Sequence, residues 1–249
     1  MSNSSSITSA QLSFNEFGTP VSSQYDDVYF SNQDGQAETE YVFLGKNQLP
    51  ERWLDKASVK EDYFVIGETG FGTGLNFFVT WLNFINSFKS NDSELKLMFF
   101  SFEKHPLTQN DLRIALKSWP QFAKLTDELL SQYPEEITSD TKFLLNNNRV
   151  ELRLIIGDVN ERIPEIMLPL ADAWYLDGFA PSKNPEMWTQ NLFDHISRLT
   201  KPGGTIATFT AAGFVRRGLI ESGFQMQKHK GFGKKREMIA GQKPNSGDE

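Results

Sequence analysis

The chain has 249 residues, enough for one large domain or one domain with a small appendage, and its 39% hydrophobic and 23% charged residues are ordinary for a soluble globular protein. It contains no Cys and only three His, which excludes a disulfide framework and a thiolate metal site and disfavours a zinc site, so we expect no metal. The net charge of −7 is unevenly spread. Residues Arg198 to Arg236 include nine Lys or Arg and one acid, so this stretch carries +8 and the remainder −15.

The N-terminal residues MSNSSSITSAQ lack a basic segment followed by an apolar one, and the chain has no run of 18 uninterrupted apolar residues. We therefore predict neither a secretory signal nor a transmembrane helix, and expect a cytoplasmic monomer that does not contact a membrane. Residues 1–12 are predicted to be a flexible tail. Residues 13–60 are predicted to form a small lid or edge element, with a β-hairpin of Val28–Phe30 and Tyr41–Leu44 around Asp34-Gly35.

Residues 61–241 alternate strand-like and helix-like segments. The apolar run Tyr63–Glu68 precedes a glycine-rich turn and the helix-like segment LNFFVTWLNFINSF, and similar runs recur at Leu95–Glu103, Arg149–Asp158, Ala171–Gly178 and Gly203–Thr210. This α/β alternation is typical of a mostly parallel sheet with helices on both faces. We predict a helical insertion at 104–148, broken near Pro120, an antiparallel hairpin at the sheet edge near the C-terminus, and a flexible tail at 242–249.

The turn GETGFGTGLN, which begins at Gly67, indicates the kind of ligand. It has no Lys, so it is not a phosphate-binding P-loop, and Leu75 stands where a dinucleotide fingerprint needs its third glycine. Glu68 would repel a pyrophosphate but suits a cationic or hydroxyl-bearing ligand. The glycines let the backbone close on that ligand, and S-adenosylmethionine meets both conditions.

Acidic residues follow three further strands, where open α/β sheets bind their ligands. Glu103 can accept hydrogen bonds from ribose hydroxyls, and Asp158 can accept from an adenine amino group beside a donor on the Val159 backbone. Each could instead cap a helix. Asp177, in LDGFAPSKNPEMW, can present a carboxylate that orients an amine and takes its proton, with the Phe179 ring beside it; alternatively, Asp177 only turns the loop and Phe179 packs in the core.

Two glycine-flanked basic turns lie near the C-terminus. They are GFVRRG and GFGKKRE, which carry Arg216, Arg217, Lys234, Lys235 and Arg236. Such turns are either a solvated surface or a site for a phosphate backbone.

Longer motifs resemble a known family. GETGFGTGLNF, SFEKHPLT, WYLDGFAPSKNPEMWTQNLF, PGGTIATFTAAGFVRRGL and KGFGKKREMIAG look like the methyltransferase domain of the bifunctional tRNA 5-methylaminomethyl-2-thiouridine biosynthesis proteins. The resemblance extends to FNEFGTPVSSQYDDVYFS and YVFLGKNQLPERW, so it covers nearly the whole chain.

The resemblance implies a Rossmann-like S-adenosylmethionine-dependent methyltransferase fold. It also implies methyl transfer to the aminomethyl nitrogen of 5-aminomethyl(-2-thio)uridine at the wobble position of tRNA. By the motif match, Asp177 is the catalytic residue, and whether it takes the proton or only orients the amine stays open. The implied cofactor contacts are Glu68, Gly70, Phe71, Gly72, Gly74, Asn76, Glu103, Asp158, Val159 and Asp177. The implied tRNA contacts are Phe179, Lys183, Arg216, Arg217, Lys234, Lys235 and Arg236.

The family proteins continue into an FAD-dependent oxidoreductase domain, whereas this sequence ends at GQKPNSGDE with no second glycine fingerprint. We therefore expect no oxidase activity and no bound FAD in this chain. Two other functions stay open: a small-amine methyltransferase or aminopropyltransferase of the same fold, and a non-catalytic nucleoside-binding domain.

Overall fold

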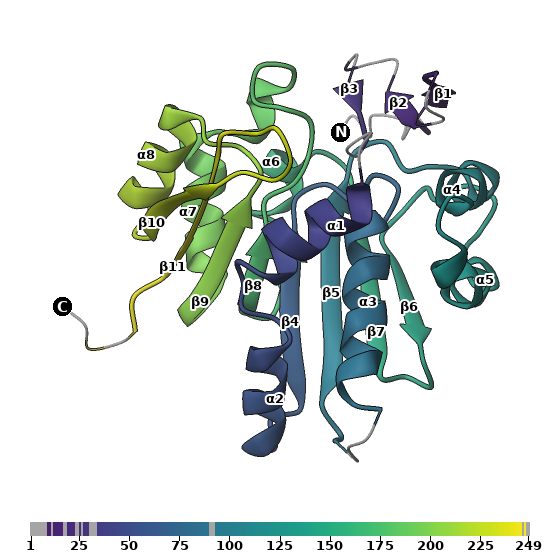
Figure 1. Ribbon diagram of the computed structural model, residues 1–249, viewed down its shortest axis with the longest axis horizontal. Helices are drawn as coiled ribbons and strands as arrows, with labels where there is room; N and C mark the ends of the chain where they lie inside the picture. Colours follow the sequence, from purple (N-terminus) through teal and green to yellow (C-terminus); the bar gives the residue numbers. More distant parts are fainter. Residues whose placement is uncertain are drawn as a thin grey trace.

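The structure is a computed structural model, and it describes residues 9–10, 12–16, 19–22, 25, 27–29, 34–89, 93–245 and 247. Within these residues, a small antiparallel sheet lies near the N-terminus and a large sheet occupies the centre of the molecule (Figure 1). The small sheet consists of β1 (Leu12–Phe14), β2 (Pro20–Ser22) and β3 (Asp27–Val28). The order across the central sheet is β10 (Gln225–Lys230), β11 (Glu237–Gln242), β9 (Thr200–Thr208), β8 (Ala171–Tyr175), β4 (Tyr63–Glu68), β5 (Lys96–Glu103), β7 (Val150–Ile156) and β6 (Thr141–Leu145).

The five strands β9, β8, β4, β5 and β7 run parallel, and the antiparallel pair β10–β11 forms one edge of the sheet. From β4 the chain moves outward through β5 and β7, and then returns to β8 on the other side of β4. Strand order therefore reverses between β4 and β8, which is where α/β sheets of this kind bind their ligands. The predicted fold class and the C-terminal edge hairpin are confirmed.

Helices cover both faces of the sheet. On one face are α1 (Gly35–Thr39), the π-helix η1 (Glu40–Leu44), α2 (Glu51–Ser58), α3 (Leu75–Ser87), α4 (Gln109–Leu116), the 3-10 helix η2 (Pro120–Phe122) and α5 (Ala123–Leu130). On the other are α6 (Val159–Arg162), the 3-10 helix η3 (Pro185–Met187), α7 (Gln190–Arg198) and α8 (Gly213–Glu221). Within the described residues, no helix is both long and apolar enough to cross a bilayer.

The alternation of side chains along the strands explains this two-sided core. In β4, Phe64 and Ile66 pack with the α3 face while Val65 packs with the α7 face, and all three are buried. Strand β5 alternates in the same way. A buried aromatic side chain removes about 150–250 Å² of surface from water. The Phe side chains of β5 and the Phe and Trp side chains of α3 therefore dominate the packing that holds β4 and its turn in place.

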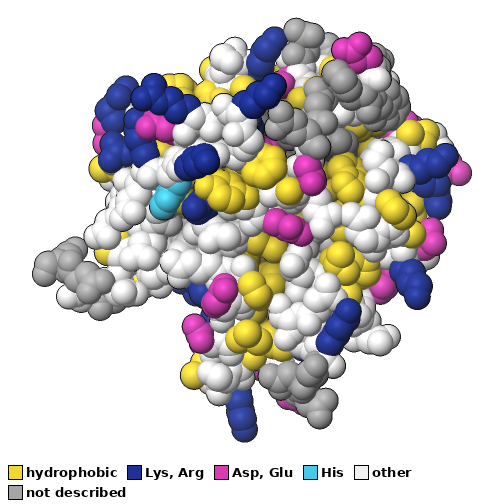
Figure 2. Space-filling model, viewed as in Figure 1, with side chains coloured by type: hydrophobic (Ala, Val, Ile, Leu, Met, Phe, Trp, Pro, Cys, Tyr) yellow, Lys and Arg dark blue, Asp and Glu magenta, His cyan; other side chains and the backbone are white. Residues whose placement is uncertain are grey.

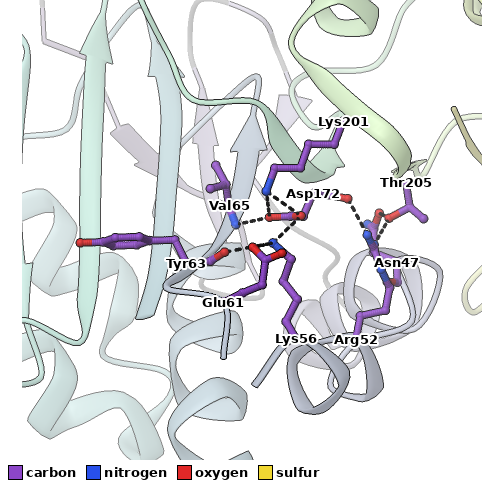
Figure 3. A network of polar contacts seen from close by, with 9 residues as sticks. All are labelled: Asn47, Arg52, Lys56, Glu61, Tyr63, Val65, Asp172, Lys201 and Thr205. Carbon is purple, nitrogen blue, oxygen red and sulfur yellow. Dashed lines mark hydrogen bonds and ion pairs between the residues drawn. The ribbon is translucent and has the colours of Figure 1, made fainter. Parts of the chain in front are cut away.

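A buried polar network ties α2 to the start of the central strands (Figure 3). The Asp172 carboxylate in β8 accepts from the Val65 backbone N–H at 2.8 Å and pairs with Lys56 at 2.9 Å and Lys201 at 3.0 Å. Beside it, Arg52 donates to the Asp172 carbonyl at 2.9 Å. This network lies at the end of β8 opposite to Asp177, and it fixes the N-terminal helices on the sheet.

The predicted hairpin strand Tyr41–Leu44 is wrong, because these residues form the π-helix η1. The Asp34 side chain accepts from the Ala37 backbone N–H at 2.9 Å and so begins a helix where a hairpin turn was expected. The Phe43 ring then stacks on the Tyr175 ring of the sheet, with 4.9 Å between the ring centroids. Of the other predicted strand, Val28 belongs to β3, and Phe30 lies outside the described residues.

The predicted insertion at 104–148 has the expected helices on either side of Pro120, but it also contains strand β6, which pairs antiparallel with β7. Two residues that were assigned to the predicted tails belong to strands. Leu12 begins β1 and Gln242 ends β11, while the Lys243 N–H donates to the Gly204 carbonyl at 2.8 Å. Residues 1–8, 11, 246, 248 and 249 lie outside the described part of the chain.

Candidate functional site

A cavity of about 540 Å³ lies at the carboxyl ends of β8, β4, β5 and β7, a size typical of small-molecule sites. The small N-terminal sheet and α1 cover it, and the turn between β10 and β11 closes one side (Figure 1). The four acids predicted at strand ends therefore follow four neighbouring strands. Of the predicted cofactor contacts, the cavity is lined by Gly70, Phe71, Gly72, Asn76, Glu103, Asp158, Val159 and Asp177, whereas Glu68 and Gly74 do not line it.

The glycine turn brings β4, β5 and the Asp177 loop together. Gly72 and Gly74 have φ of 53° and 73°, in the left-handed region that favours glycine, and Gly74 is the N-cap of α3. A Cβ atom on Gly70 would lie 3.3 Å from the Asp177 carbonyl oxygen, and the Thr69 hydroxyl donates to that same oxygen at 2.6 Å. The turn thus holds Asp177, which lies about a hundred residues further along the chain.

Glu103 accepts two backbone hydrogen bonds, from Gly72 N–H at 2.8 Å and from His105 N–H at 2.7 Å. Burial raises the pKa of Glu103, although these two donors favour its ionised form. A carboxylate has about four acceptor sites, so Glu103 keeps acceptor capacity for a hydroxyl group of a ligand.

Asp158 is engaged on both oxygens. One accepts from the Asn160 backbone N–H at 2.9 Å, which caps α6, and the other pairs with Lys104 at 2.9 Å. Burial acts to raise the pKa of Asp158, but the bonds from Lys104 and Asn160 outweigh it, so the pKa is lowered. The Asp158 side chain therefore caps α6, as one of the two predictions for it stated. It also borders the cavity beside Val159.

Asp177, Asn76 and Glu68 form a chain of polar contacts. The Asn76 amide nitrogen donates to Asp177 Oδ2 at 2.6 Å and to Glu68 Oε1 at 2.9 Å, while its oxygen accepts from the Thr39 hydroxyl at 2.7 Å. Ser101 donates to the other oxygen of Glu68 at 2.7 Å. Glu68 is completely buried, and its carboxylate contacts the cavity-lining residue Asn76.

Burial raises the pKa of both carboxyl groups. Asp177 rises to about 6, with opposing hydrogen bonds from Gly178 N–H and Asn76. Glu68 rises to about 8, through burial first and the nearby charge of Asp177 second. At neutral pH, Asp177 is therefore the ionised member and Glu68 the protonated one, which separates their chemical roles.

Aromatic rings form a wall next to Asp177. The Phe179 ring stacks on Tyr25 at 4.5 Å and meets Tyr29 edge-on at 5.5 Å. Sequence reasoning found Phe179 but not the two tyrosines: it read Tyr29 as part of the strand Val28–Phe30 and gave Tyr25 no role. A signal was available, because QYDDVYF combines aromatic and acidic residues without the apolar alternation of a half-buried strand.

The predicted basic residues divide into two groups. Lys234 and Lys235 line the cavity along with Phe179. Lys183, Arg216, Arg217 and Arg236 do not line it, and Arg216 donates to the Met226 carbonyl at 3.3 Å. Lys and Arg side chains gather over α8 and β10 on the face shown in Figure 2.

A mostly parallel sheet with a glycine-rich turn after one strand and an acid at the end of the next, both at the switch point, is an arrangement typical of α/β proteins that bind nucleotides. Residues 120–244 match the family described as S-adenosyl-L-methionine-dependent methyltransferase, and the chain belongs to that family.

Named relatives agree with the motif resemblance. The tRNA 5-methylaminomethyl-2-thiouridine biosynthesis bifunctional protein MnmC of Aeromonas hydrophila is 53% identical over 241 residues, which cover 96% of this chain and 36% of that protein. The protein of the same name from Vibrio cholerae is 54% identical over 242 residues, covering 95% and 36%. This chain spans about a third of the length of these curated relatives.

A solved structure shows the same fold. The crystal structure of MNMC2 from Aquifex aeolicus superposes with a TM-score of 0.72 at 24% identity, covering 97% of this chain and 73% of that one.

Proposed function

We propose that this chain transfers a methyl group from S-adenosylmethionine to the aminomethyl nitrogen of 5-aminomethyl(-2-thio)uridine at the tRNA wobble position. The observation that carries the proposal is the Asp177 carboxylate, held by Asn76 and Gly178 beside the glycine turn and the aromatic wall. The relatives' name supports the choice of tRNA. The chain spans about a third of the length of those bifunctional proteins, and the activity that we propose for it is the methyl transfer.

The residues present fit the cofactor. The Glu103 carboxylate lines the cavity and suits the ribose hydroxyls, and the backbone of Gly70 and Gly72 borders the cavity where the amino-acid part would lie. Val159 and Asp158 border the space left for adenine, with Asp158 held in place by Lys104. Glu68 and Gly74 act behind this layer, by positioning Asn76 and by beginning α3.

S-adenosylmethionine, when bound, supplies a methyl group on a positively charged sulfur. The substrate amine must present a free electron pair to that carbon, and Asp177 is placed to orient it and accept its proton. With its pKa at about 6, Asp177 is ionised at neutral pH and yet basic enough to accept that proton. Asn76 and Gly178 fix the two carboxylate oxygens, so little reorganisation is needed when the amine arrives.

The uridine would be turned out of the anticodon loop to reach this cavity, which costs less for a loop base than for a paired one. Phe179 and the tyrosines beside it offer a surface on which a base can stack, an interaction worth roughly 1–3 kcal/mol. The basic surface over α8 and β10 suits the tRNA backbone.

The test is Asp177→Asn, assayed with labelled S-adenosylmethionine and tRNA that lacks the modification. We expect turnover to fall by about 10²–10⁴-fold, the usual contribution of a general base. Cofactor affinity measured by calorimetry should change far less than turnover. Asp194→Asn, at an exposed acid on α7 whose partners are Gln190 and Ser222, is the matched control and should retain full activity. Equal turnover of the Asp177→Asn enzyme and the wild type would remove Asp177 from the proposal.

A further inference from the structure

An ion pair crosses the mouth of the cavity. Lys235 Nζ, in the turn between β10 and β11, lies 2.6 Å from Glu38 Oε1 of α1, and both residues line the cavity together with Asp177. Lys235 also lies over the Phe209 ring, 4.7 Å from its centroid. The pair therefore joins two segments almost two hundred residues apart in the chain, directly beside the candidate catalytic carboxylate.

Lys235 also belongs to a second, shallower groove. That groove is lined by Ala180, Pro181, Ser182, Phe209, Thr210, Ala211, Ala212, Phe214, Lys235 and Glu237. It shares Ala180, Phe209 and Lys235 with the cavity, so the two spaces meet at the ion pair. Phe214 is an exposed aromatic side chain in the groove, which gives a neighbouring base a ring on which to stack.

The two partners differ in exposure. The Glu38 side chain is 12% exposed and the Lys235 side chain 48%. An anion arriving from solvent can therefore reach Lys235 without entering the cavity, whereas a cation inside the cavity can reach Glu38. Both charges act on Asp177, since Glu38 raises its pKa and Lys235 lowers it.

We propose that Glu38 recognises the cationic aminomethyl group of the substrate, and that Lys235 holds Glu38 until a phosphate of the RNA backbone draws Lys235 away. This inference rests on the proposed function and names how the same site selects its substrate. A partly exposed ion pair is weak enough to exchange one partner for another. After the exchange, the largely shielded Glu38 carboxylate pairs with the amine, and Lys235 pairs with a phosphate.

The exchange makes recognition depend both on the aminomethyl group and on a phosphate of the RNA backbone. A uridine without the aminomethyl group offers Glu38 no cation, and an acidic substituent meets the repulsion of two carboxylates, Glu38 and Asp177. A free nucleoside carries the amine but no phosphate, so it must compete with Lys235 for Glu38. The RNA substrate does not face that competition.

One substrate, two nucleoside inhibitors and two variants separate these effects. KM is measured for tRNA carrying 5-aminomethyl(-2-thio)uridine, and Ki is measured for free 5-aminomethyluridine and for uridine as inhibitors of that reaction. We expect Glu38→Gln to raise both the tRNA KM and the 5-aminomethyluridine Ki by about tenfold or more, the value of a charged hydrogen bond. The preference for 5-aminomethyluridine over uridine should shrink to the same extent.

Lys235→Met gives the decisive result, because its two effects have opposite signs. The tRNA KM should rise because a phosphate contact is lost, with a weaker dependence on salt. The Ki of 5-aminomethyluridine should fall, because Glu38 no longer has a competing cation. Glu40→Gln is the matched control, since Glu40 pairs with Gln36 in the adjoining helical turn and does not line the cavity; it should leave both constants unchanged.

Three results would overturn the inference. The first is a Lys235→Met variant that binds both tRNA and nucleoside more weakly, and the second is a Glu38→Gln variant with wild-type constants. The third is a wild-type enzyme that 5-aminomethyluridine does not inhibit better than uridine. Unaltered affinity for S-adenosylmethionine shows that each variant is folded. If the wild-type protein methylates no tRNA at all, the proposed function itself fails, and this result is distinct from the other three.

Discussion

Replacing Asp172 with Asn should destabilise the protein without changing its chemistry. The Asp172 side chain is 4% exposed and compensates the charges of Lys56 and Lys201, whose side chains are 18% and 33% exposed (Figure 3). The substitution removes the counter-charge that Lys56 and Lys201 share, and leaves Lys56 with its more exposed partner Glu61. It also places an uncharged amide beside the Val65 N–H and the two ammonium groups.

The size of the effect follows from these exposures. Removing one partner of a fully buried ion pair costs about 3–5 kcal/mol, but both lysines can regain some hydration here, so we expect a loss of about 2–3 kcal/mol. For a domain of this size, that corresponds to a fall in melting temperature of about 5–10 °C. Turnover per folded molecule should not change, because Asp172 lies about 16 Å from Asp177 along β8 and its extension.

The assay is thermal or urea unfolding of Asp172→Asn beside Lys228→Met, which breaks the exposed pair of Lys228 and Glu237. The control should cost less than about 0.5 kcal/mol. A melting temperature for Asp172→Asn within the range of the control would refute the reasoning, because it would mean that the network contributes no more than a surface ion pair.

Three further outcomes concern the cavity. The ratio kcat/KM for tRNA should fall in proportion to the ionised fraction of Asp177 below a pH of about 6, and a flat profile from pH about 5 to 8 would contradict its role. Asn76→Ala should lower kcat and move that midpoint to higher pH, because the lost hydrogen bond favours the ionised form of Asp177; an unmoved midpoint would exclude Asn76 as a positioning residue. Glu68 binds its proton more tightly in the folded than in the unfolded state, so its contribution to stability is fully present below pH about 4.5 and is lost as pH rises to about 8. Unfolding of Glu68→Gln should therefore depend less on pH than that of the wild type, and parallel curves would show that Glu68 is not protonated in the folded state.

The parallel core was predictable because its signals are local. Each of the runs that became β4, β5, β7, β8 and β9 is apolar and ends near a glycine or an acid, and parallel strands with both faces buried need no partner-specific pattern. Strand β6 was missed because its residues follow a helical segment in the sequence. They form a strand because they pair with the edge of β7, and the local sequence does not indicate this pairing. Tyr41–Leu44 was misassigned because its β-branched and aromatic residues also suit a buried helical face, which packing against Tyr175 selects.

For the site, the sequence indicated which acids end strands but not what each carboxylate contacts. The positions of Glu103 and Asp177 at the cavity follow from strand topology alone. The burial of Glu68 behind Asn76 depends on how α3 packs, and the cover supplied by Tyr29 and Glu38 depends on a long-range contact of the N-terminal segment. Such contacts between distant segments leave no periodic pattern in the chain.

The most direct test of the central claim is nucleoside analysis by mass spectrometry. Undermodified tRNA is incubated with the protein and S-adenosylmethionine that carries an isotope-labelled methyl group, and is then digested. The proposed function predicts that the label appears in 5-methylaminomethyl(-2-thio)uridine from the wobble position and disappears with Asp177→Asn. Label in another nucleoside, or methyl transfer to small amines with none to tRNA, would contradict it.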